Sequence, residues 1–145
     1  MITRVIFCIL LSGCSAVLPS GQKKFSPPPM EYERWVQPTT DTDYVVIQKA
    51  MLECGATDPF GNNKQFAIKN KNENLNRWVG VEKCMKKSGF LIKPGLESNI
   101  CQNFSYIDLC QSQNTILIPS RDASRRLNSP FCKDPIYAKN KTCQP

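Results

Sequence analysis

Two stretches of the chain carry hydrophobic residues at three- and four-residue spacing, and this pattern predicts two helices. The first is expected over residues 41–54, where Thr40 and Asp41 offer N-caps and Asp43 suits the positive end of the helix dipole. Gly55 follows and supplies a left-handed C-terminal cap. The positions that define the buried face of this helix are Tyr44, Ile47, Met51 and Cys54.

The second helix is expected over residues 72–87, with Asn72 as its cap and Gly89 as its stop. Each of the two helices ends with a cysteine shortly before a glycine. A disulfide between Cys54 and Cys84 would lock the helices together and contribute about 3 to 4 kcal/mol in the chain-entropy account of a loop of about 30 residues. The faces of the second helix are traced by Leu75, Trp78, Val81 or Glu82, and Met85.

Signals for β structure are short. Phe90, Leu91 and Ile92 form an apolar run that ends at a turn. Tyr106–Leu109 alternates in polarity and Thr115–Ile118 favours a strand, so these segments either pair as a small hairpin or form short helical turns. The expected fold class is therefore α-rich, an α+β domain with minor β content.

Residues 1–13 have the layout of a secretory signal peptide. Arg4 precedes an apolar run, Val5–Leu11, that would rise only about 10 Å as a helix, against a hydrocarbon core of roughly 30 Å. A membrane-spanning helix is therefore excluded in this segment, and a cleaved export signal is expected.

The junction Leu11-Ser12-Gly13-Cys14 resembles the lipobox of bacterial lipoproteins. The resemblance implies cleavage before Cys14, a diacylglycerol on its sulfur and acylation of its new amine. Acyl chains on Cys14 would tie the protein to a membrane. Ser15 follows, which under bacterial sorting rules favours the outer membrane. The alternative is ordinary signal cleavage, for example after Ala16, which would release a soluble secreted protein.

Residues 14–38 are expected to form a proline-rich tether, and residues 39–145 the globular domain. Prolines in the tether favour extended polyproline II, which gives a reach of up to roughly 70 Å. Tyr32, Trp35 and Val36 interrupt its polar pattern. They either dock this end of the tether onto the domain or present an aromatic peptide to a partner.

An even number of cysteines remains once Cys8 leaves with the signal and Cys14 carries the lipid. Such a number in an exported chain indicates three disulfides. No two cysteines have CxxC spacing, so neither a zinc site nor a catalytic dithiol is expected. The pairing that local context favours is Cys54–Cys84, Cys101–Cys110 and Cys132–Cys143.

The last four cysteines lie in two similar segments. Ser98–Cys101 and Ser129–Cys132 share the form Ser-x-apolar-Cys, with Tyr106 or Tyr137 five residues after the cysteine and a Cys-Gln pair beyond. Unless the likeness is coincidental, it predicts two disulfide-closed lobes. Each lobe would pack its apolar residue and its tyrosine on the helix pair.

The absence of histidine from the 145 residues excludes several classes of site. Ser-His-Asp and Cys-His nucleophiles, histidine-ligated zinc and haem sites with axial histidine all need this side chain. The carboxylates lie at expected caps, loops and helix faces, with no pair marked out for acid–base chemistry. A protein that is not an enzyme and holds no cofactor or metal is therefore expected.

The chain is basic, with a net charge of +7, and much of the excess lies in residues 59–95. Lys83, Lys86 and Lys87 either complement the negative end of the second helix or form a face for an anionic partner. Lipopolysaccharide phosphates, phospholipid headgroups and acidic proteins are such partners. No nucleic-acid partner is expected in the envelope.

Arg121, Arg125 and Arg126 form a second basic cluster around Asp122. On a short helix Arg121 and Arg125 would share a face, and Asp122 could pair with Arg126. The cluster is either a solvated surface of ion pairs or a clamp for phosphate or carboxylate, which arginine binds with two hydrogen bonds.

The layout resembles a loose group of small proteobacterial lipoproteins. The resemblance rests on the lipobox and on the stretches Leu52–Gly55, Glu82–Phe90 and Arg126–Cys132. It implies export, lipidation and disulfides, and brings no catalytic residues. The expected function is that of a non-catalytic lipoprotein of the outer membrane, an interaction or accessory subunit of an envelope assembly. The alternatives are a protective exclusion or inhibitor lipoprotein and a soluble secreted, disulfide-rich basic binder.

Overall fold

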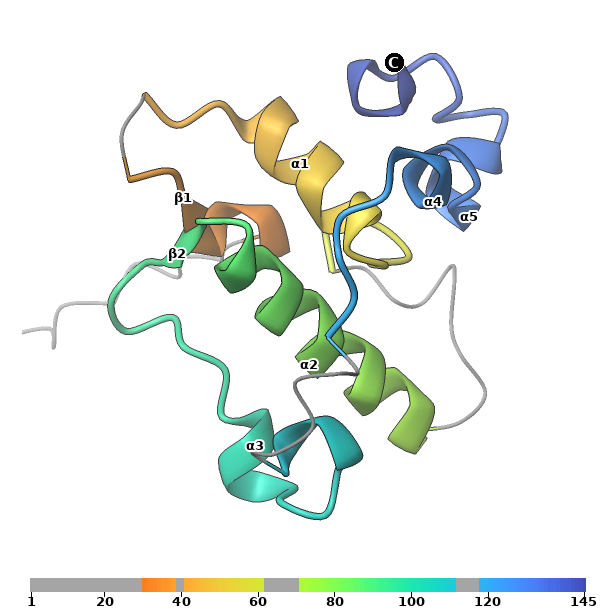
Figure 1. Cartoon of the computed structure of the whole chain (residues 1–145). Helices are drawn as coiled ribbons and strands as arrows, with labels where there is room; N and C mark the ends of the chain where they lie inside the picture. Colours follow the sequence, from red (N-terminus) through yellow and green to blue (C-terminus); the bar gives the residue numbers. More distant parts are fainter. Residues whose placement is uncertain (1–29, 39–40, 62–70, 112–117) are drawn as a thin grey trace, which may run out of the picture.

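The computed structural model describes residues 30–38, 41–61, 71–111 and 118–145 (Figure 1). The expected signal peptide, the Cys14 anchor and most of the expected tether lie outside these residues. None of the helices in these ranges has both the length and the apolar character that crossing a membrane requires. In chain order the helices and strands are η1 (Glu31–Arg34), β1 (Trp35–Val36), α1 (Tyr44–Glu53), α2 (Lys71–Lys87), β2 (Leu91–Ile92), α3 (Ile100–Asn103), η2 (Asp108–Cys110), α4 (Ala123–Leu127), α5 (Pro130–Lys133) and η4 (Lys141–Cys143). The fold is α-rich with minor β content, as predicted.

Helix α1 ends before Gly55, as predicted, but it begins at Tyr44 rather than at residue 41, because its N-cap is Asp43 and not Thr40 or Asp41. The Asp43 carboxylate accepts a hydrogen bond from the backbone N–H of Val45 at 2.8 Å, which satisfies a donor that the first turn leaves free. Gly55 has a φ of +102°, a left-handed conformation that glycine adopts without steric cost. The predicted buried face is wrong at Tyr44, which is exposed. It lies at the first turn, where its ring meets the edge of Tyr32 instead of the core.

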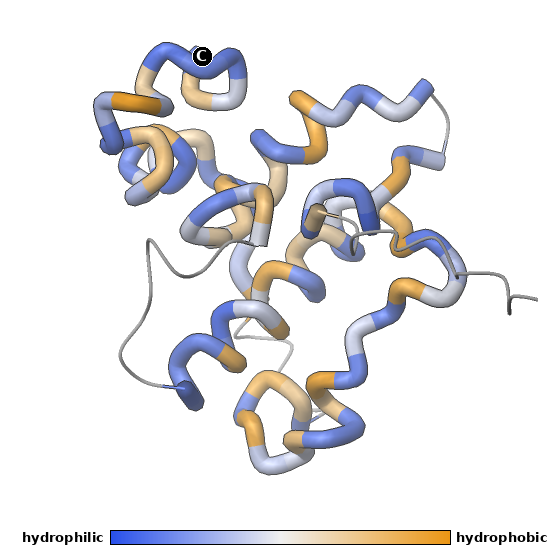
Figure 2. The backbone as a smooth tube through the Cα atoms, turned by 180° about the vertical axis from the view of Figure 1, so that it is seen from behind, coloured by the Kyte–Doolittle hydropathy of each residue, from blue (hydrophilic) through white to orange (hydrophobic). Residues whose placement is uncertain are grey.

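Helix α2 is the long helix of the domain, and it is amphipathic along its length. Its first turns are hydrophilic (Figure 2), whereas its second half buries Val81, Cys84 and Met85. The helix ends at Lys87, just before Gly89, whose φ is +86°, as predicted. The predicted cap is wrong, because the helix begins at Lys71 and Asn72 lies inside its first turn. Leu75 and Trp78, on the predicted faces, are only partly buried.

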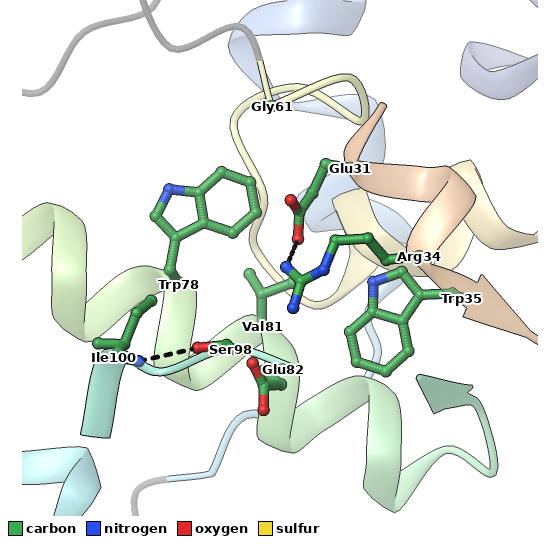
Figure 3. Close-up of a pocket in the computed structure, with 9 residues that line it drawn as sticks. All are labelled: Glu31, Arg34, Trp35, Gly61, Trp78, Val81, Glu82, Ser98 and Ile100. Atoms are coloured by element: carbon green, nitrogen blue, oxygen red, sulfur yellow. Dashed lines mark hydrogen bonds and ion pairs between the residues drawn. The ribbon is translucent and has the colours of Figure 1, made fainter. Parts of the chain in front are cut away.

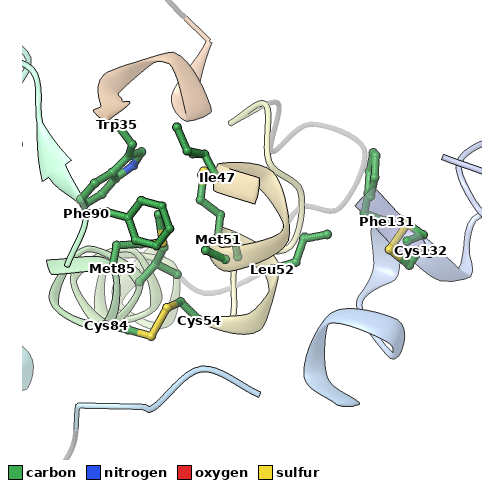
Figure 4. Close-up of a cluster of buried hydrophobic side chains, with 14 residues drawn as sticks. Trp35, Ile47, Met51, Leu52, Cys54, Cys84, Met85, Phe90, Phe131 and Cys132 are labelled. Atoms are coloured by element: carbon green, nitrogen blue, oxygen red, sulfur yellow. A yellow bond between two sulfur atoms is a disulfide. The ribbon is translucent and has the colours of Figure 1, made fainter. Parts of the chain in front are cut away.

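The core lies where α1 crosses α2. Ile47 and Met51 of α1 meet Met85 of α2 and Phe90 beyond it (Figure 4). Beside them the Cys54–Cys84 disulfide joins the two helices, with the Cα atoms 5.7 Å apart. This distance lies within the usual range for a disulfide. Helix α1 also contacts η1, α4 and η4, so it is the central element of the domain.

The end of the expected tether belongs to the domain. Strand β1 pairs antiparallel with β2, and Trp35 lies opposite Ile92. The Trp35 side chain is 1% exposed and forms part of the core. The expectation that the aromatic residues dock onto the domain is therefore confirmed, and the domain includes residues 30–38 rather than beginning at 39.

The remaining two disulfides close the predicted lobes. Cys101–Cys110 and Cys132–Cys143 have Cα atoms 5.1 Å and 5.3 Å apart. The first lobe contacts α2 and the second contacts α1 (Figure 1). The second packs as predicted. Phe131 is buried and its ring stacks on that of Tyr137, with the ring centroids 4.5 Å apart. In the first lobe the prediction fails, because its apolar residue, Ile100, is only partly buried and Tyr106 is exposed. Ile107 is the buried apolar residue there.

The hairpin interpretation of Tyr106–Leu109 is wrong. Asp108–Cys110 is the 3-10 helix η2, in which the Cys110 N–H donates to the carbonyl of Ile107 at 2.8 Å. The last residue of this turn, Cys110, forms the disulfide with Cys101, nine positions earlier. Most of the expected second strand lies outside the described residues.

Candidate functional site

A short loop after α1 holds η1 in place and forms one wall of a cleft. The carbonyls of Pro59 and Phe60 accept hydrogen bonds from the N–H groups of Tyr32 and Glu31, each at 3.2 Å. Gly61 completes the wall with a φ of +76°. A Cβ atom at Gly61 would lie 3.0 Å from the Cβ of Glu31, so the close approach of the two segments requires glycine.

The cleft lies between η1 and α2 and has a volume of about 240 Å³. Glu31 and Arg34 extend into it from η1, and Trp78 faces them from α2 (Figure 3). Both tryptophans of the chain contribute to its lining. The lining residues are Glu31, Arg34, Trp35, Gly61, Trp78, Val81, Glu82, Ser98 and Ile100.

The indole N–H of Trp35, a residue that lines the cleft, is buried, and none of the residues that the structure describes accepts a hydrogen bond from it. A buried donor without a partner costs about 1 to 3 kcal/mol, so buried indole N–H groups usually find an acceptor. Trp35 belongs to the buried core, and it also contributes to the lining of the cleft. An oxygen atom bound in the cleft would satisfy the donor.

Arg34 and Glu31 form an ion pair inside the cleft. One terminal nitrogen of Arg34 donates to a carboxylate oxygen of Glu31, and Arg34 Nε donates to the carbonyl of Leu96 at 2.9 Å. Burial raises the pKa of the Glu31 carboxyl above its ordinary value. The Arg34 guanidinium opposes this rise, and the carboxylates of Glu82 and Asp58 add to it.

Glu82 supplies a second carboxylate on the α2 side of the cleft. Its Oε1 atom accepts a hydrogen bond from Lys86 Nζ at 2.8 Å, one turn further along the helix. Ser98 lies opposite, where its hydroxyl oxygen accepts from the N–H of Ile100 at 3.2 Å. The acidic groups of the cleft are thus each matched by a basic group of the same chain.

The arginine cluster predicted from the sequence is occupied by partners within the chain. Both Arg121 and Arg126 pair with Glu53, the last residue of α1. Arg126 also donates to the carbonyl oxygens of Thr142 at 2.9 Å and Gln144 at 2.5 Å. The interpretation as a solvated surface of ion pairs is wrong for Arg126, which is buried, and it fits Arg121, which is exposed and paired with Glu53. The donors of Arg126 hold α1, α4 and the C-terminal segment together.

The predicted pairing of Asp122 with Arg126 is also wrong. Asp122 caps α4 instead, and its carboxylate accepts from the backbone N–H of Ser124 at 2.8 Å. The hydrogen bonds from Ser124 lower the pKa of the Asp122 carboxyl. Arg125 donates to the carbonyls of Glu53 and Ser120, at 2.6 Å and 3.0 Å. Its side chain therefore connects α4 to the end of α1.

The lysines predicted as an anionic-partner face lie at the C-terminal end of α2. Lys86 and Lys87 are exposed and Lys83 is partly buried. Lys86 pairs with Glu82, which offsets part of the local positive charge. Among the described residues, no acidic side chain lies within ion-pair distance of Lys83 or Lys87.

The cleft residues were not singled out as a site from the sequence, although Trp35 and Trp78 were placed on packing faces. No local sequence pattern marks them as a site, because the cleft is lined by residues from η1, the loop at Gly61, α2 and the segment 98–100, which meet only in space. Cys14 lies outside the described residues. Among the residues that the structure describes, no cluster of Cys, Asp and Glu side chains is arranged to hold a metal ion.

Comparison with known proteins adds no relative to these observations. No protein-family model, no curated protein and no solved structure matches the chain. What the chain does is therefore inferred from its own residues.

Proposed function

We propose that this chain is a non-catalytic bacterial envelope lipoprotein, anchored to the outer membrane through lipid on Cys14, that acts as an interaction or accessory subunit. The domain would be held away from the membrane by the proline-rich segment that follows Cys14. The cleft between η1 and α2 would be its binding site.

The single observation that carries the proposal is the pairing of all six cysteines downstream of Cys14. The three disulfides connect Cys54–Cys84, Cys101–Cys110 and Cys132–Cys143. Such bonds persist in oxidising compartments such as the periplasm and the cell surface. A domain braced in this way fits an exported protein, and the pairing leaves Cys14 available for lipid.

The cleft supports binding rather than catalysis. Its carboxylates, Glu31 and Glu82, are each engaged by a basic side chain of the same chain. A general acid and a general base need groups that can exchange protons with a substrate, and a nucleophile needs an activating base. The described lining offers no such pairing, while its aromatic and hydrogen-bonding groups suit recognition.

The test is the intact, non-reduced mass of the protein extracted from its native membrane. We expect loss of residues 1–13, added acyl mass on Cys14 and the loss of six hydrogen atoms through three disulfides. A Cys14→Ser variant should leave the membrane fraction while keeping its disulfides. A chain that begins beyond Cys14 and carries no lipid would overturn the anchor and favour a secreted binder.

A crosslinking experiment tests the accessory role. Crosslinks to a resident envelope assembly, recovered in unstressed cells, would support it. Crosslinks formed only with a factor that enters the envelope from outside would favour a protective exclusion or inhibitor lipoprotein instead. The anionic-partner hypothesis is tested in parallel with Lys83→Glu and Lys87→Glu, which should weaken retention on vesicles that contain anionic phospholipid if that face binds.

A further inference from the structure

We infer that the cleft between η1 and α2 binds one six-membered sugar ring of a glycan. This inference rests on the proposed function, because it names the class of ligand that the binding site would take. It is carried by three features of the cleft: its charge balance, its tryptophans and its size.

The charges that line the cleft are already neutralised. Arg34 pairs with Glu31, and Glu82 pairs with Lys86. A charged ligand would have to break one of these pairs, whereas a hydroxyl group can both donate to a carboxylate and accept from a guanidinium. Hydrogen bonds to charged groups are also the stronger ones. The cleft therefore favours an uncharged ligand that carries several hydroxyl groups.

The tryptophans add a hydrophobic surface and an unused donor. Among the described residues no aromatic ring lies against Trp78, which contributes an indole ring to the lining (Figure 3). One face of a pyranose ring consists of C–H groups, which can pack on an indole. On the opposite side the buried Trp35 N–H has no acceptor in the described part of the chain, and a ring or hydroxyl oxygen would provide one. A sugar ring presents both surfaces at once.

The size of the cleft limits the ligand to one ring. Its volume of about 240 Å³ is below the roughly 300 to 1,000 Å³ of pockets that enclose a drug-sized molecule. The cleft is partly open to solvent, so the neighbouring rings of a glycan could extend out of it. One sugar unit is thus held in the site while the rest of the chain passes by.

The test uses intrinsic fluorescence, because both tryptophans of the protein line the cleft. The oxidised, mature protein is titrated with a tetramer of β-1,4-linked N-acetylglucosamine, a cell-wall-like glycan, and separately with maltotetraose, a neutral hexose chain. We expect a saturable change in emission with at least one of them. Binding of only the first identifies a wall-type glycan, and binding of the second identifies a hexose polymer of the envelope. Both outcomes support a sugar site.

Variants show where the sugar binds. Trp78→Ala should weaken the affinity by about tenfold, because it removes the stacking surface while Trp35 stays as the reporter. Glu82→Gln, which keeps the shape of the side chain, should also weaken the affinity for the sugar. This variant keeps the inference testable if Trp78→Ala fails to fold. Lys87→Gln, on the same helix and outside the cleft, is the control and should bind as the parent protein does.

Two results would overturn the inference. One is the absence of any emission change up to the solubility limit of both tetramers, in a sample whose mass shows all three disulfides. The other is binding that Trp78→Ala and Glu82→Gln both leave unchanged in their folded forms. Neither result bears on lipidation or export, which are decided by the mass measurement alone.

Discussion

Glu53 and Arg126 form an ion pair inside the domain, with Arg126 Nε 3.1 Å from Glu53 Oε1. Their side chains are 10% and 5% exposed. The second carboxylate oxygen of Glu53 accepts from Arg121 at 2.7 Å. One carboxylate at the end of α1 therefore anchors the segment that leads into α4 and, through Arg126, the C-terminal segment as well.

Replacing Glu53 by glutamine should destabilise the domain strongly. The change leaves the buried Arg126 guanidinium without its counter-charge, and removal of one partner from a buried pair typically costs about 3 to 5 kcal/mol. The measurement is urea unfolding followed by circular dichroism. Glu73→Gln is the matched control, since the Glu73 carboxylate is 61% exposed and lies 3.7 Å from Arg77. An exposed pair of this kind contributes at most about 1 kcal/mol, and equal losses in the two variants would contradict a structural role for Glu53.

Replacing Trp35 by alanine should also destabilise the domain, although the sequence places this residue in the tether. The side chain is buried, and a Trp→Ala change in a core costs about 3 to 5 kcal/mol. Thermal unfolding of the oxidised protein measures the loss. Ile136→Ala serves as the control, because Ile136 is 77% exposed and its truncation should change stability by less than about 0.5 kcal/mol. If Trp35→Ala is as stable as the control, the end of the tether is not part of the folded domain.

The three disulfides should contribute unequally to stability. Cys54–Cys84 spans 30 residues and joins the two core helices, whereas Cys101–Cys110 spans 9 and lies at the edge of the domain. The chain-entropy account gives about 3 to 4 kcal/mol for the first and about 1 kcal/mol less for the second. Double Cys→Ala variants of each pair, compared by urea unfolding, test the order. If the variant without Cys101–Cys110 loses more stability than the variant without Cys54–Cys84, the small lobe and not the helix pair depends most on its disulfide.

The contribution of Glu31 to stability should depend on pH. Burial raises the pKa of its carboxyl above the ordinary value of 4.5, so between these two pKa values the folded chain binds more protons than the unfolded chain. Stability from this group is therefore lost as the pH rises through that window, even though Arg34 offsets part of the rise in pKa. Glu31→Gln does not titrate. As the pH rises from 4 to 7, the unfolding free energy of Glu31→Gln should therefore increase relative to that of the parent protein. A difference that stays constant would show that the Glu31 carboxyl titrates normally.

Much of the local structure could be predicted from the sequence, because it depends on residues close together in the chain. The stops at Gly55 and Gly89 act within one helical turn, whereas the choice of Asp43 over Asp41 as the N-cap of α1 was not predicted. The two lobe disulfides span 9 and 11 residues. The Cys54–Cys84 bond was predictable for a similar reason, since each cysteine lies at the end of a helix that its own periodicity defines.

The sites where groups distant in the sequence meet were not predictable in this way. Arg34 reaches the carbonyl of Leu96, 62 positions away, and Arg126 reaches Glu53, 73 positions away. Periodicity and charge patterns report which face of an element is buried, but they do not report which other element covers that face. For this reason the sequence left open whether the arginines form a surface of ion pairs or a clamp for an external anion.

The sequence by itself thus determined two helices, their ends, the disulfide framework and the basic character of the chain, since these follow from spacing and composition. Only the tertiary structure decided that Trp35 enters the core, that Glu53 engages the arginines and that two tryptophans share a cleft with Glu31 and Arg34. The physical reason is that burial and ion pairing depend on distances in space. Those distances are set only when α1, α2 and the two lobes pack together.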